Sequence, residues 1–265
     1  MAVIINDRVT YDMADRVAYI ELANPDAANS LDQRMGEALR EAAERAAKDV
    51  ATGAVRVVVV SAQGRLFSVG GDLGEFAGAT DRGVAVKATA DNLHAGLTTL
   101  RALEVPVVSV INGTAAGGGV GIALVGDIVI AAAEAKLVLA YTASGLTADC
   151  GLSWVIPNRL SWARAMDLAL TNRVLTGAEA ADWGLVSRAV PHADLDKAVA
   201  DLVAGLRNGA SNALTSTKRL MLEAMGRTMA DQMNEEAATI SRVIAEPDGV
   251  EGINAFLAKR RPTYQ

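Results

Sequence analysis

The 265-residue sequence is poor in the residues on which redox and metal chemistry most often depend. A single cysteine, Cys150, excludes an internal disulfide, a CxxC redox pair and a chain-held iron–sulfur cluster. His94 and His192 stand 98 positions apart and form no HExxH or other local pair of metal ligands, so we expect no metal. Neither a Gly-Lys dipeptide nor a GxSxG motif occurs, which excludes a Walker A loop and a nucleophile elbow. An enzyme with this sequence would depend on carboxylates, hydroxyls and backbone amides.

Positive charge is also in short supply. The chain has 25 basic against 31 acidic residues and a pI near 5.1, which argues against nucleic acid or an anionic membrane as a partner. The long uncharged run at residues 105–126 contains six glycines and several polar residues, so it predicts a buried strand, a turn and a buried helix rather than a membrane span. Early charges interrupt any signal-peptide core. We therefore expect a cytoplasmic protein.

The apolar pattern alternates between strand and helix over most of the chain. It predicts strands at residues 9–12, 16–22, 55–60, 105–111, 127–131, 136–140 and 185–190, and helices at 31–48, 117–125 and 161–170. Ser30 with Gln33 and Thr176 with Glu179 have the spacing of capping boxes. From residue 193 onward the pattern is helical, with breaks near Gly209, Gly226 and residues 247–249. We predict an α/β core over residues 1–195 and a C-terminal helical region over 196–265, both part of one fold.

Two glycine-rich segments each follow a strongly apolar strand. They read FSVGGDL at residues 67–73 and NGTAAGGGVG at residues 112–121. Glycine permits unusual backbone angles and lets a ligand approach the main chain closely. Taken alone, either segment is better explained by tight turns and close packing than by a binding site. The second segment fails the dinucleotide-binding pattern GxGxxG at its last position.

Together with other motifs in the same order, these segments resemble the crotonase (enoyl-CoA hydratase/isomerase) superfamily. The other matching stretches are the loop at residues 24–31, Asp127, the LTG stretch from residue 175 to Val190, and FLAKRRP at residues 256–262. The resemblance covers nearly the whole chain. It implies a spiral of ββα units with a helical C-terminal trimerisation region, and hence a homotrimer or a dimer of trimers.

The resemblance also implies an acyl-CoA thioester substrate, as in fatty acid metabolism, with coenzyme A entering as part of the substrate and no separate cofactor. The backbone amides of Gly71 and Gly118 are then expected to hold the thioester oxygen as it becomes an enolate. By motif position, further contacts to the substrate or to CoA fall to Ala28, Ser68, Gly70, Asp72, Leu73, Thr114, Gly117, Tyr141, Leu146, Phe256 and Lys259. A neighbouring subunit would supply the last two. Three of these residues can also be present for structural reasons rather than for substrate contact. The structural reason is core packing for Tyr141, turn capping for Asp72 and a helix-end position for Lys259.

Hydratases of the superfamily use two glutamates, and by position this chain has Gly121 and Tyr141 instead. The segment SGLTADCG at residues 144–151 resembles the aspartate motif of crotonase-type isomerases. We therefore predict double-bond isomerisation with Asp149 as the single acid/base. The alternatives are an enoyl-CoA hydratase, a catalytically quiet acyl-CoA-binding protein, and a structural Asp149 that caps a turn before Gly151. His94 is predicted to be a partly exposed structural residue and Cys150 a small buried thiol. Residues 76–92 are expected to form variable loops from which the acyl chain cannot be deduced.

Overall fold

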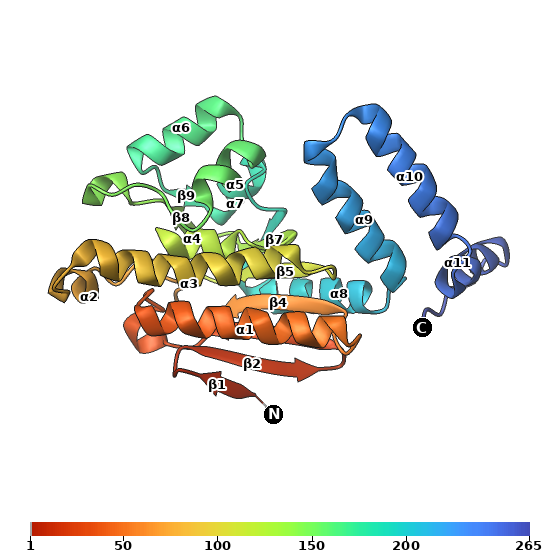
Figure 1. Cartoon of the computed structure of the whole chain (residues 1–265), viewed down its shortest axis with the longest axis horizontal. Helices are drawn as coiled ribbons and strands as arrows, with labels where there is room; N and C mark the ends of the chain where they lie inside the picture. Colours follow the sequence, from red (N-terminus) through yellow and green to blue (C-terminus); the bar gives the residue numbers. More distant parts are fainter. Residues whose placement is uncertain (1) are drawn as a thin grey trace.

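The computed structural model describes residues 2–265 and is organised around a seven-stranded sheet (Figure 1). Within this sheet, the first three strands pair antiparallel and all the other neighbouring strands pair parallel. In spatial order the strands are β1 (Val3–Ile5), β2 (Val9–Ala14), β3 (Val17–Leu22), β4 (Val57–Ala62), β5 (Val107–Ile111), β7 (Ile128–Ala132) and β10 (Arg188–Val190). A small second sheet joins β6 (Ala115–Ala116), β8 (Lys136–Val138) and β9 (Leu175–Thr176).

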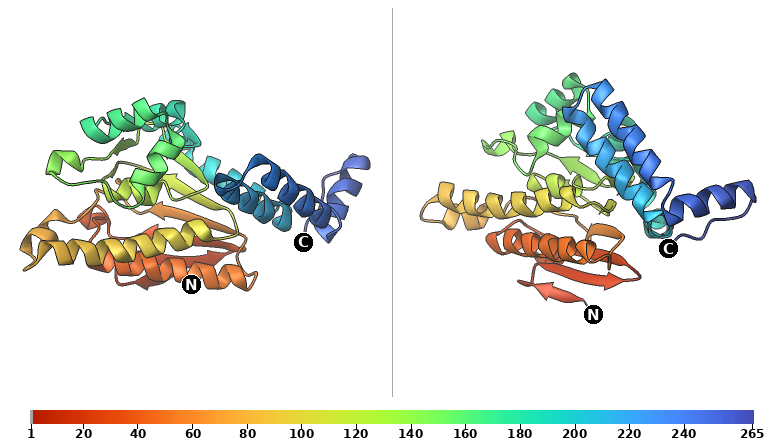
Figure 2. Two further views of the ribbon diagram at one scale, coloured as in Figure 1. Left: turned by 45° about the horizontal axis from the view of Figure 1, so that its top comes forward. Right: turned by 45° about the vertical axis from the view of Figure 1, so that its right-hand side comes forward.

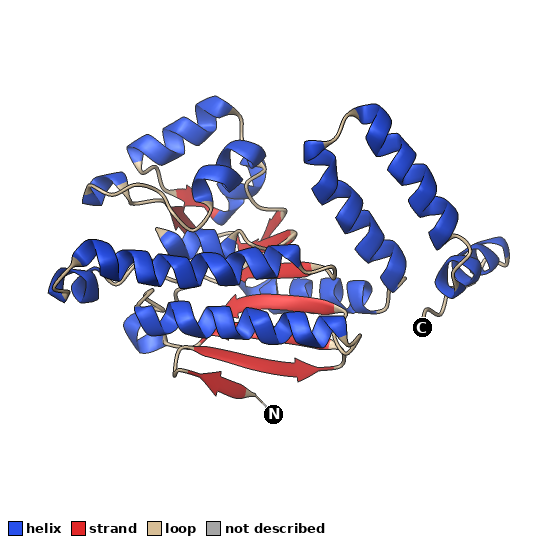
Figure 3. Cartoon of the chain, viewed as in Figure 1, coloured by secondary structure: helices blue, strands red, loops and turns tan. Residues whose placement is uncertain are grey.

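Helices cover the sheet and extend beyond it (Figure 3). Helix α1 packs along α3 and contacts β2 and β3, whereas α8 contacts β4 and β7. The helix that begins at residue 195 therefore still covers the sheet. The helices are α1 (Gln33–Ala51), α2 (Leu73–Gly78), α3 (Arg82–Ala102), α4 (Gly118–Ala123), α5 (Leu152–Arg159), α6 (Trp162–Thr171), α7 (Gly177–Trp183), α8 (Leu195–Arg207), α9 (Ser211–Glu223), α10 (Met229–Val243) and α11 (Pro247–Leu257).

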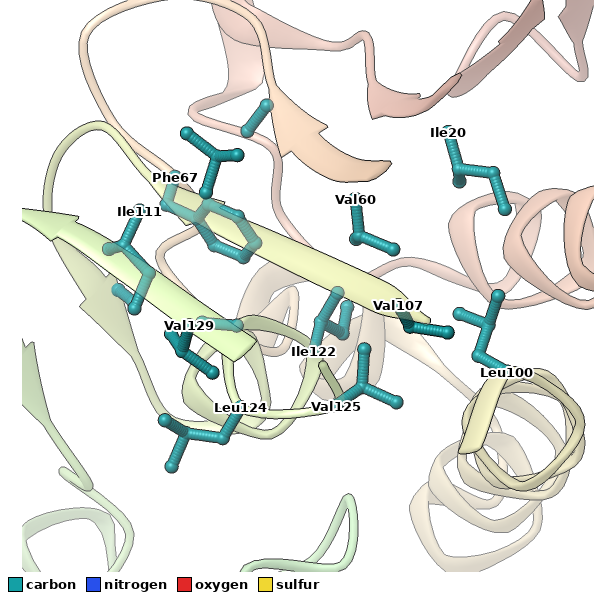
Figure 4. Close-up of a cluster of buried hydrophobic side chains, with 14 of the residues drawn as sticks. Ile20, Val60, Phe67, Leu100, Val107, Ile111, Ile122, Leu124, Val125 and Val129 are labelled. Carbon is teal, nitrogen blue, oxygen red and sulfur yellow. The ribbon is translucent and has the colours of Figure 1, made fainter. Parts of the chain in front are cut away.

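The core lies where the parallel strands meet α4 (Figure 4). In β4 the first four residues are all valines and all buried, as expected for a parallel strand that is covered on both faces. Phe67 is fully buried in the same cluster. Burying a side chain of this size contributes about 1.5–3 kcal/mol. Because Phe67 is the first residue of the first glycine segment, its burial fixes where that segment begins.

Several local predictions are confirmed and others are wrong. Thr176 and Glu179 form the predicted capping box. The box predicted at Ser30 is wrong, because the helix begins two residues later and Asp32 caps it by accepting the Met35 N–H at 2.6 Å. Leu31 cannot be helical because it pairs with Gly71 in a β-bridge.

Three further differences lie in helical segments. Most of residues 76–92, expected to be loops, belongs to helices α2 and α3. The sequence predicts no helix over residues 152–159, because a proline commonly marks a helix boundary, yet Pro157 lies inside α5. The break predicted near residues 247–249 lies just before them, at residues 244–246, because Pro247 begins α11, a position where its missing N–H costs little.

The last three helices stand away from the sheet (Figure 2). Lys218 on α9 ties them to the core: its ammonium lies 2.7 Å from the Asp127 carboxylate and donates to the Val105 carbonyl at 2.9 Å. Large apolar side chains on this part of the chain, such as Met229 and Phe256, are exposed. Across residues 2–265, no helix is both long enough and apolar enough to cross a membrane.

Candidate active site

The two glycine segments lie against each other beyond the carboxyl ends of β4 and β5, two central strands of the sheet. The Ala116 N–H donates to the Ser68 carbonyl at 2.8 Å, and the Leu31 N–H donates to the Gly70 carbonyl at 2.8 Å. Gly70 has a positive φ of 87°, and a Cβ at this position would lie 2.7 Å from the Ala116 carbonyl oxygen. Glycine is therefore required at residue 70 for the close approach of the two segments.

Two amides remain free where the segments meet. Within residues 2–265, the N–H groups of Gly71 and Gly118 have no hydrogen-bond acceptor. Gly118 is the first residue of α4, where a helix leaves its N–H groups unpaired. Both glycines line one cavity of about 250 Å³. The arrangement presents two N–H donors to whatever occupies that cavity.

The cavity is largely apolar and contains a single carboxylate. Of the lining residues that the structure describes, Asp149 is the only acidic one. Helices α2 and α3 supply one wall, and the loop after β8 supplies the other. Besides the two glycines and Asp149, the lining comprises Leu31, Val69, Leu73, Phe76, Val86, Thr89, Ala90, Leu93, Gly117, Leu139, Ala140, Tyr141, Ser144, Leu146 and Thr147.

A hydrogen bond from Tyr141 orients the Asp149 side chain. The phenol hydroxyl donates to Oδ1 of Asp149. Burial raises the pKa of the Tyr141 phenol well above its ordinary value, and the neighbouring Cys150 and Asp149 add to the rise. The phenol therefore remains a proton donor at neutral pH. A Cβ at Gly118 would lie 3.6 Å from the same carboxylate oxygen, so Asp149 faces the Gly118 end of the cavity.

The backbone turn that carries Asp149 is tightly constrained. Cys150 adopts a left-handed φ of 48°, which is uncommon for a residue with a side chain, and Gly151 follows with 75°. His94 on α3 accepts the Cys150 N–H at its Nε2 atom, at 3.1 Å. Cys150 is buried as predicted, and burial raises the pKa of its thiol. His94 is exposed as predicted, but it also supports the turn next to Asp149.

Gly121 leaves no space for a side chain. A Cβ there would lie 2.5 Å from both the Cβ and the carbonyl oxygen of Cys150. Contacts this short do not occur between real atoms. The turn after Asp149 thus occupies the space into which any side chain at residue 121 would project.

The structure brings together seven of the residues predicted from sequence. Gly71, Leu73, Gly117, Gly118, Tyr141, Leu146 and Asp149 all line the cavity. Phe256 and Lys259 are not among the lining residues; they lie in or just beyond α11, at the opposite end of the molecule from α2 (Figure 1). The Phe256 side chain is 81 % exposed. Any contact between these two residues and a substrate of this cavity would have to come from another copy of the chain.

The remaining predicted residues support the glycine segments. Ser68 is fully buried; its hydroxyl donates to the Asn29 carbonyl at 2.7 Å and accepts the Gly70 N–H. Asp72 caps α2 by accepting the Glu75 N–H at 3.0 Å.

Two backbone carbonyls hold the same segment. The Thr114 carbonyl accepts the N–H groups of Phe67 and Ser68, and the Ala28 carbonyl accepts that of Val69. A direct contact between the substrate and Ala28, Ser68, Gly70, Asp72 or Thr114 stays a prediction.

The sequence predicted loops, not helices, for most of the cavity wall that α2 and α3 supply. Val86, Ala90 and Leu93 recur at helical spacing, but the first two fall within residues 76–92, where variable loops were expected. His94 is one residue further on. Its approach to Asp149, 55 positions away, is a tertiary contact that no local pattern reveals.

The chain is similar to known proteins over nearly its whole length. Residues 12–265 match the family model described as enoyl-CoA hydratase/isomerase. The chain is 32 % identical over 256 residues to a Rhodobacter capsulatus protein named "Probable enoyl-CoA hydratase", covering 97 % of each. It is also 32 % identical to the 1,2-epoxyphenylacetyl-CoA isomerase of Escherichia coli, over 94 % of each chain. The crystal structure of an enoyl-CoA hydratase from Polaromonas sp. JS666 superimposes with a TM-score of 0.87 at 30 % identity, covering 97 % of this chain and 99 % of the other.

Proposed function

Because the chain belongs to the enoyl-CoA hydratase/isomerase family and has its crotonase fold, we propose that it moves a carbon–carbon double bond within an acyl-CoA thioester. One observation carries this proposal: a single carboxylate, Asp149, shares the cavity with the free N–H groups of Gly71 and Gly118. The acyl-CoA substrate is consistent with the family. The choice of isomerisation over hydration rests on the site itself.

The two amides would activate the substrate. The thioester oxygen would accept both N–H groups, which would then stabilise the negative charge that develops on it when an adjacent proton is removed. An apolar cavity strengthens such hydrogen bonds because little water competes for them. Since the main chain supplies both donors, glycine side chains suffice at these two positions.

Asp149 would move the proton. With a 3-enoyl thioester, its carboxylate takes a proton from C2, and the electron pair spreads over the thioester oxygen and C4. The same carboxyl group returns the proton to C4, giving the 2-enoyl thioester with no change in composition. Tyr141 holds Oδ1 by a hydrogen bond. The other oxygen, Oδ2, is then available for the transfer.

Hydration needs a water molecule to be activated and a proton to be delivered, and two carboxylates perform this better than one. Gly121 has no space for a second carboxylate, and Tyr141 supplies a phenol that is a donor rather than a base. The names of relatives include both a hydratase and an isomerase. Isomerisation is therefore favoured over hydration by the residues at positions 121 and 141, Gly121 and Tyr141.

The test supplies 3-enoyl-CoA and 2-enoyl-CoA separately to the wild-type protein and to Asp149→Asn. We expect double-bond migration without water addition, abolished in Asp149→Asn while acyl-CoA binding is retained. Asp91→Asn, on the exposed surface of α3, is the control. Ready hydration of 2-enoyl-CoA would identify a hydratase instead. Binding without turnover of either substrate would identify a catalytically quiet acyl-CoA-binding protein.

We also propose that the protein acts in the cytoplasm as a homotrimer or a dimer of trimers, with no cofactor beyond the CoA of its substrate. The remote position of Phe256 and Lys259 supports this assembly, since a neighbouring copy could present them to the cavity.

A further inference from the structure

A second cavity lies on the other side of Asp149. It has a volume of about 490 Å³, and its lining includes His94, Gly121, Cys150 and Trp154. Three potential metal ligands converge beside it: a ring nitrogen of His94, a carboxylate oxygen of Asp149 and the Cys150 sulfur all lie within 4.8 Å of one another. Within residues 2–265 this is the one group of three such side chains that could hold an ion.

We propose that His94, Asp149 and Cys150 form a binding site for Zn²⁺ or a similar transition-metal dication, and that an ion bound there switches the enzyme off. Imidazole nitrogen, carboxylate oxygen and thiolate sulfur are the three ligand types that zinc takes in proteins. Three protein ligands leave a fourth position for water, for which the adjoining cavity provides space. Mg²⁺ and Ca²⁺ prefer sites composed wholly of oxygen ligands and are disfavoured here.

The site needs only a small closure to bind the ion. Ligands of a tetrahedral zinc ion stand about 3.5 Å apart, so separations up to 4.8 Å must shrink by about 1 Å. His94 can supply this movement because its side chain is exposed, whereas the adjacent Asp149 and Cys150 are carried by one constrained turn. The movement has an opposing cost. If Nε2 is the ligand atom, it gives up the hydrogen bond that it accepts from the Cys150 N–H.

The charges balance when the ion binds. The Cys150 thiol releases its proton to solvent, and the thiolate together with the Asp149 carboxylate neutralises a dication. Of the lining residues that the structure describes, Arg101 is the only lysine or arginine, and its guanidinium lies over the Trp154 ring at 4.7 Å from its centroid. The ion would enter through the second cavity and would not need to pass the space occupied by an acyl chain.

The regulatory consequence rests on the proposed function, but the metal binding itself does not. An ion that holds the Asp149 carboxylate removes the group proposed to take the substrate proton. Metal binding and isomerase activity should then exclude each other, with no change to Gly71 or Gly118.

The first test measures binding without any substrate. Co²⁺ is added to the reduced protein, and the thiolate-to-cobalt charge-transfer absorption is followed, together with its loss on addition of Zn²⁺. We expect this absorption in the wild type, none in Cys150→Ala, and affinity at least about tenfold lower in His94→Ala. His192→Ala, which alters the other histidine, is the matched control and should bind as the wild type does. No thiolate band in the wild type, or an equal band in Cys150→Ala, would overturn the proposal.

The second test measures activity in graded free Zn²⁺, each variant being compared with its own metal-free rate. We expect Zn²⁺ to inhibit the wild type, EDTA to restore it, and Cys150→Ala to need at least about tenfold more Zn²⁺ for the same inhibition. Equal inhibition of both proteins would refute the regulatory step. If neither protein turns over an acyl-CoA, the proposed function fails while the cobalt titration still decides the metal site.

Discussion

The Tyr141 hydroxyl donates a hydrogen bond to Oδ1 of Asp149, eight residues further along the chain. The loop between them leads away from the small sheet and returns, so that both side chains enter one cavity. Burial keeps the phenol protonated by raising its pKa. A protonated phenol can orient a carboxylate but cannot act as a base beside it. Tyr141 thus leaves Asp149 as the single carboxylate of the cavity and engages one of its two oxygens.

Replacing Tyr141 by Phe should slow turnover more than it weakens binding. A hydrogen bond to a charged group contributes about 1.5–3 kcal/mol, so its loss should lower kcat roughly 10- to 100-fold, with a smaller change in KM. Tyr11→Phe is the control, because the Tyr11 hydroxyl donates to Asp49 far from the cavity. An unchanged kcat in Tyr141→Phe would show that the hydrogen bond does not orient the reacting carboxylate.

Two substitutions at Gly118 can separate the effect of losing its N–H group from the effect of adding a Cβ. Gly118→Ala adds a Cβ close to Leu31 and the Cys150 sulfur but keeps the N–H, whereas Gly118→Pro adds a similar Cβ and removes it. Removing one oxyanion donor typically costs about 10²–10³ in rate, and we expect this difference between the two variants. Steady-state kinetics on one acyl-CoA substrate measures it. Equal rates for Ala and Pro would contradict a role for this amide.

A glutamate at residue 121 should fail to create a hydratase. Its Cβ would overlap the Cys150 main chain, so even Gly121→Ala should lose about 1–3 kcal/mol of stability. Thermal unfolding measures this loss, and Gly205→Ala is the control because a Cβ at that helical position meets nothing within 4 Å. Gly121→Glu should be destabilised further and gain no water-adding activity. A stable Gly121→Glu protein that hydrates 2-enoyl-CoA would contradict this account of the site.

The site residues carried by distinctive motifs are the ones that the structure brings together. Gly71, Gly118 and Asp149 were identified from the order of their motifs, and the structure places all three in one cavity. The fold class was also predictable, because buried parallel strands are continuous β-branched runs such as residues 57–60. The strands depend on short stretches of sequence, whereas the site residues were recognised from several motifs in order along the chain.

Features that depend on tertiary contacts were not predictable in the same way. Helix α1 starts at Gln33 rather than Leu31 because Leu31 pairs with Gly71, 40 residues away. His94 lies near Asp149 because α3 crosses the cavity. Neither contact leaves a local periodic pattern, so reading the sequence in short windows could not find them.

The chain should assemble in solution. Met229, Phe256 and Leu257 are each more than 70 % exposed on the C-terminal helices, where burial against another copy would remove apolar surface from water. Light scattering should give a mass about three or six times 27.5 kDa. Phe256→Ser with Leu257→Ser should weaken the assembly, while Ile4→Ser, at an exposed apolar position on β1, should not. A stable wild-type monomer would contradict this expectation.

Residues 260–263 of the C-terminal tail should loosen in acid before the rest of the chain unfolds. Glu251 on α11 receives both guanidinium nitrogens of Arg260, at 2.6 and 2.7 Å, and the Thr263 N–H at 2.8 Å. The Arg260 hydrogen bonds, followed by the Thr263 N–H, lower the pKa of Glu251 to about 2 from its ordinary 4.5. Because the folded pKa is depressed, the stabilisation is complete above about pH 4.5 and is lost as the pH falls toward 2.

Hydrogen exchange at the Thr263 amide measures this detachment directly. Its protection factor should be high at pH 7 and should fall progressively below pH 4.5. Glu251→Gln should lose the protection already at pH 7, because a neutral amide binds the guanidinium only weakly. The Gln265 carbonyl, which accepts from Arg56 at 2.5 Å, gives the tail a second attachment, so the loss should be local to residues 260–263. Equal protection of Thr263 at pH 3 and pH 7 would show that the Glu251 carboxylate does not hold the tail.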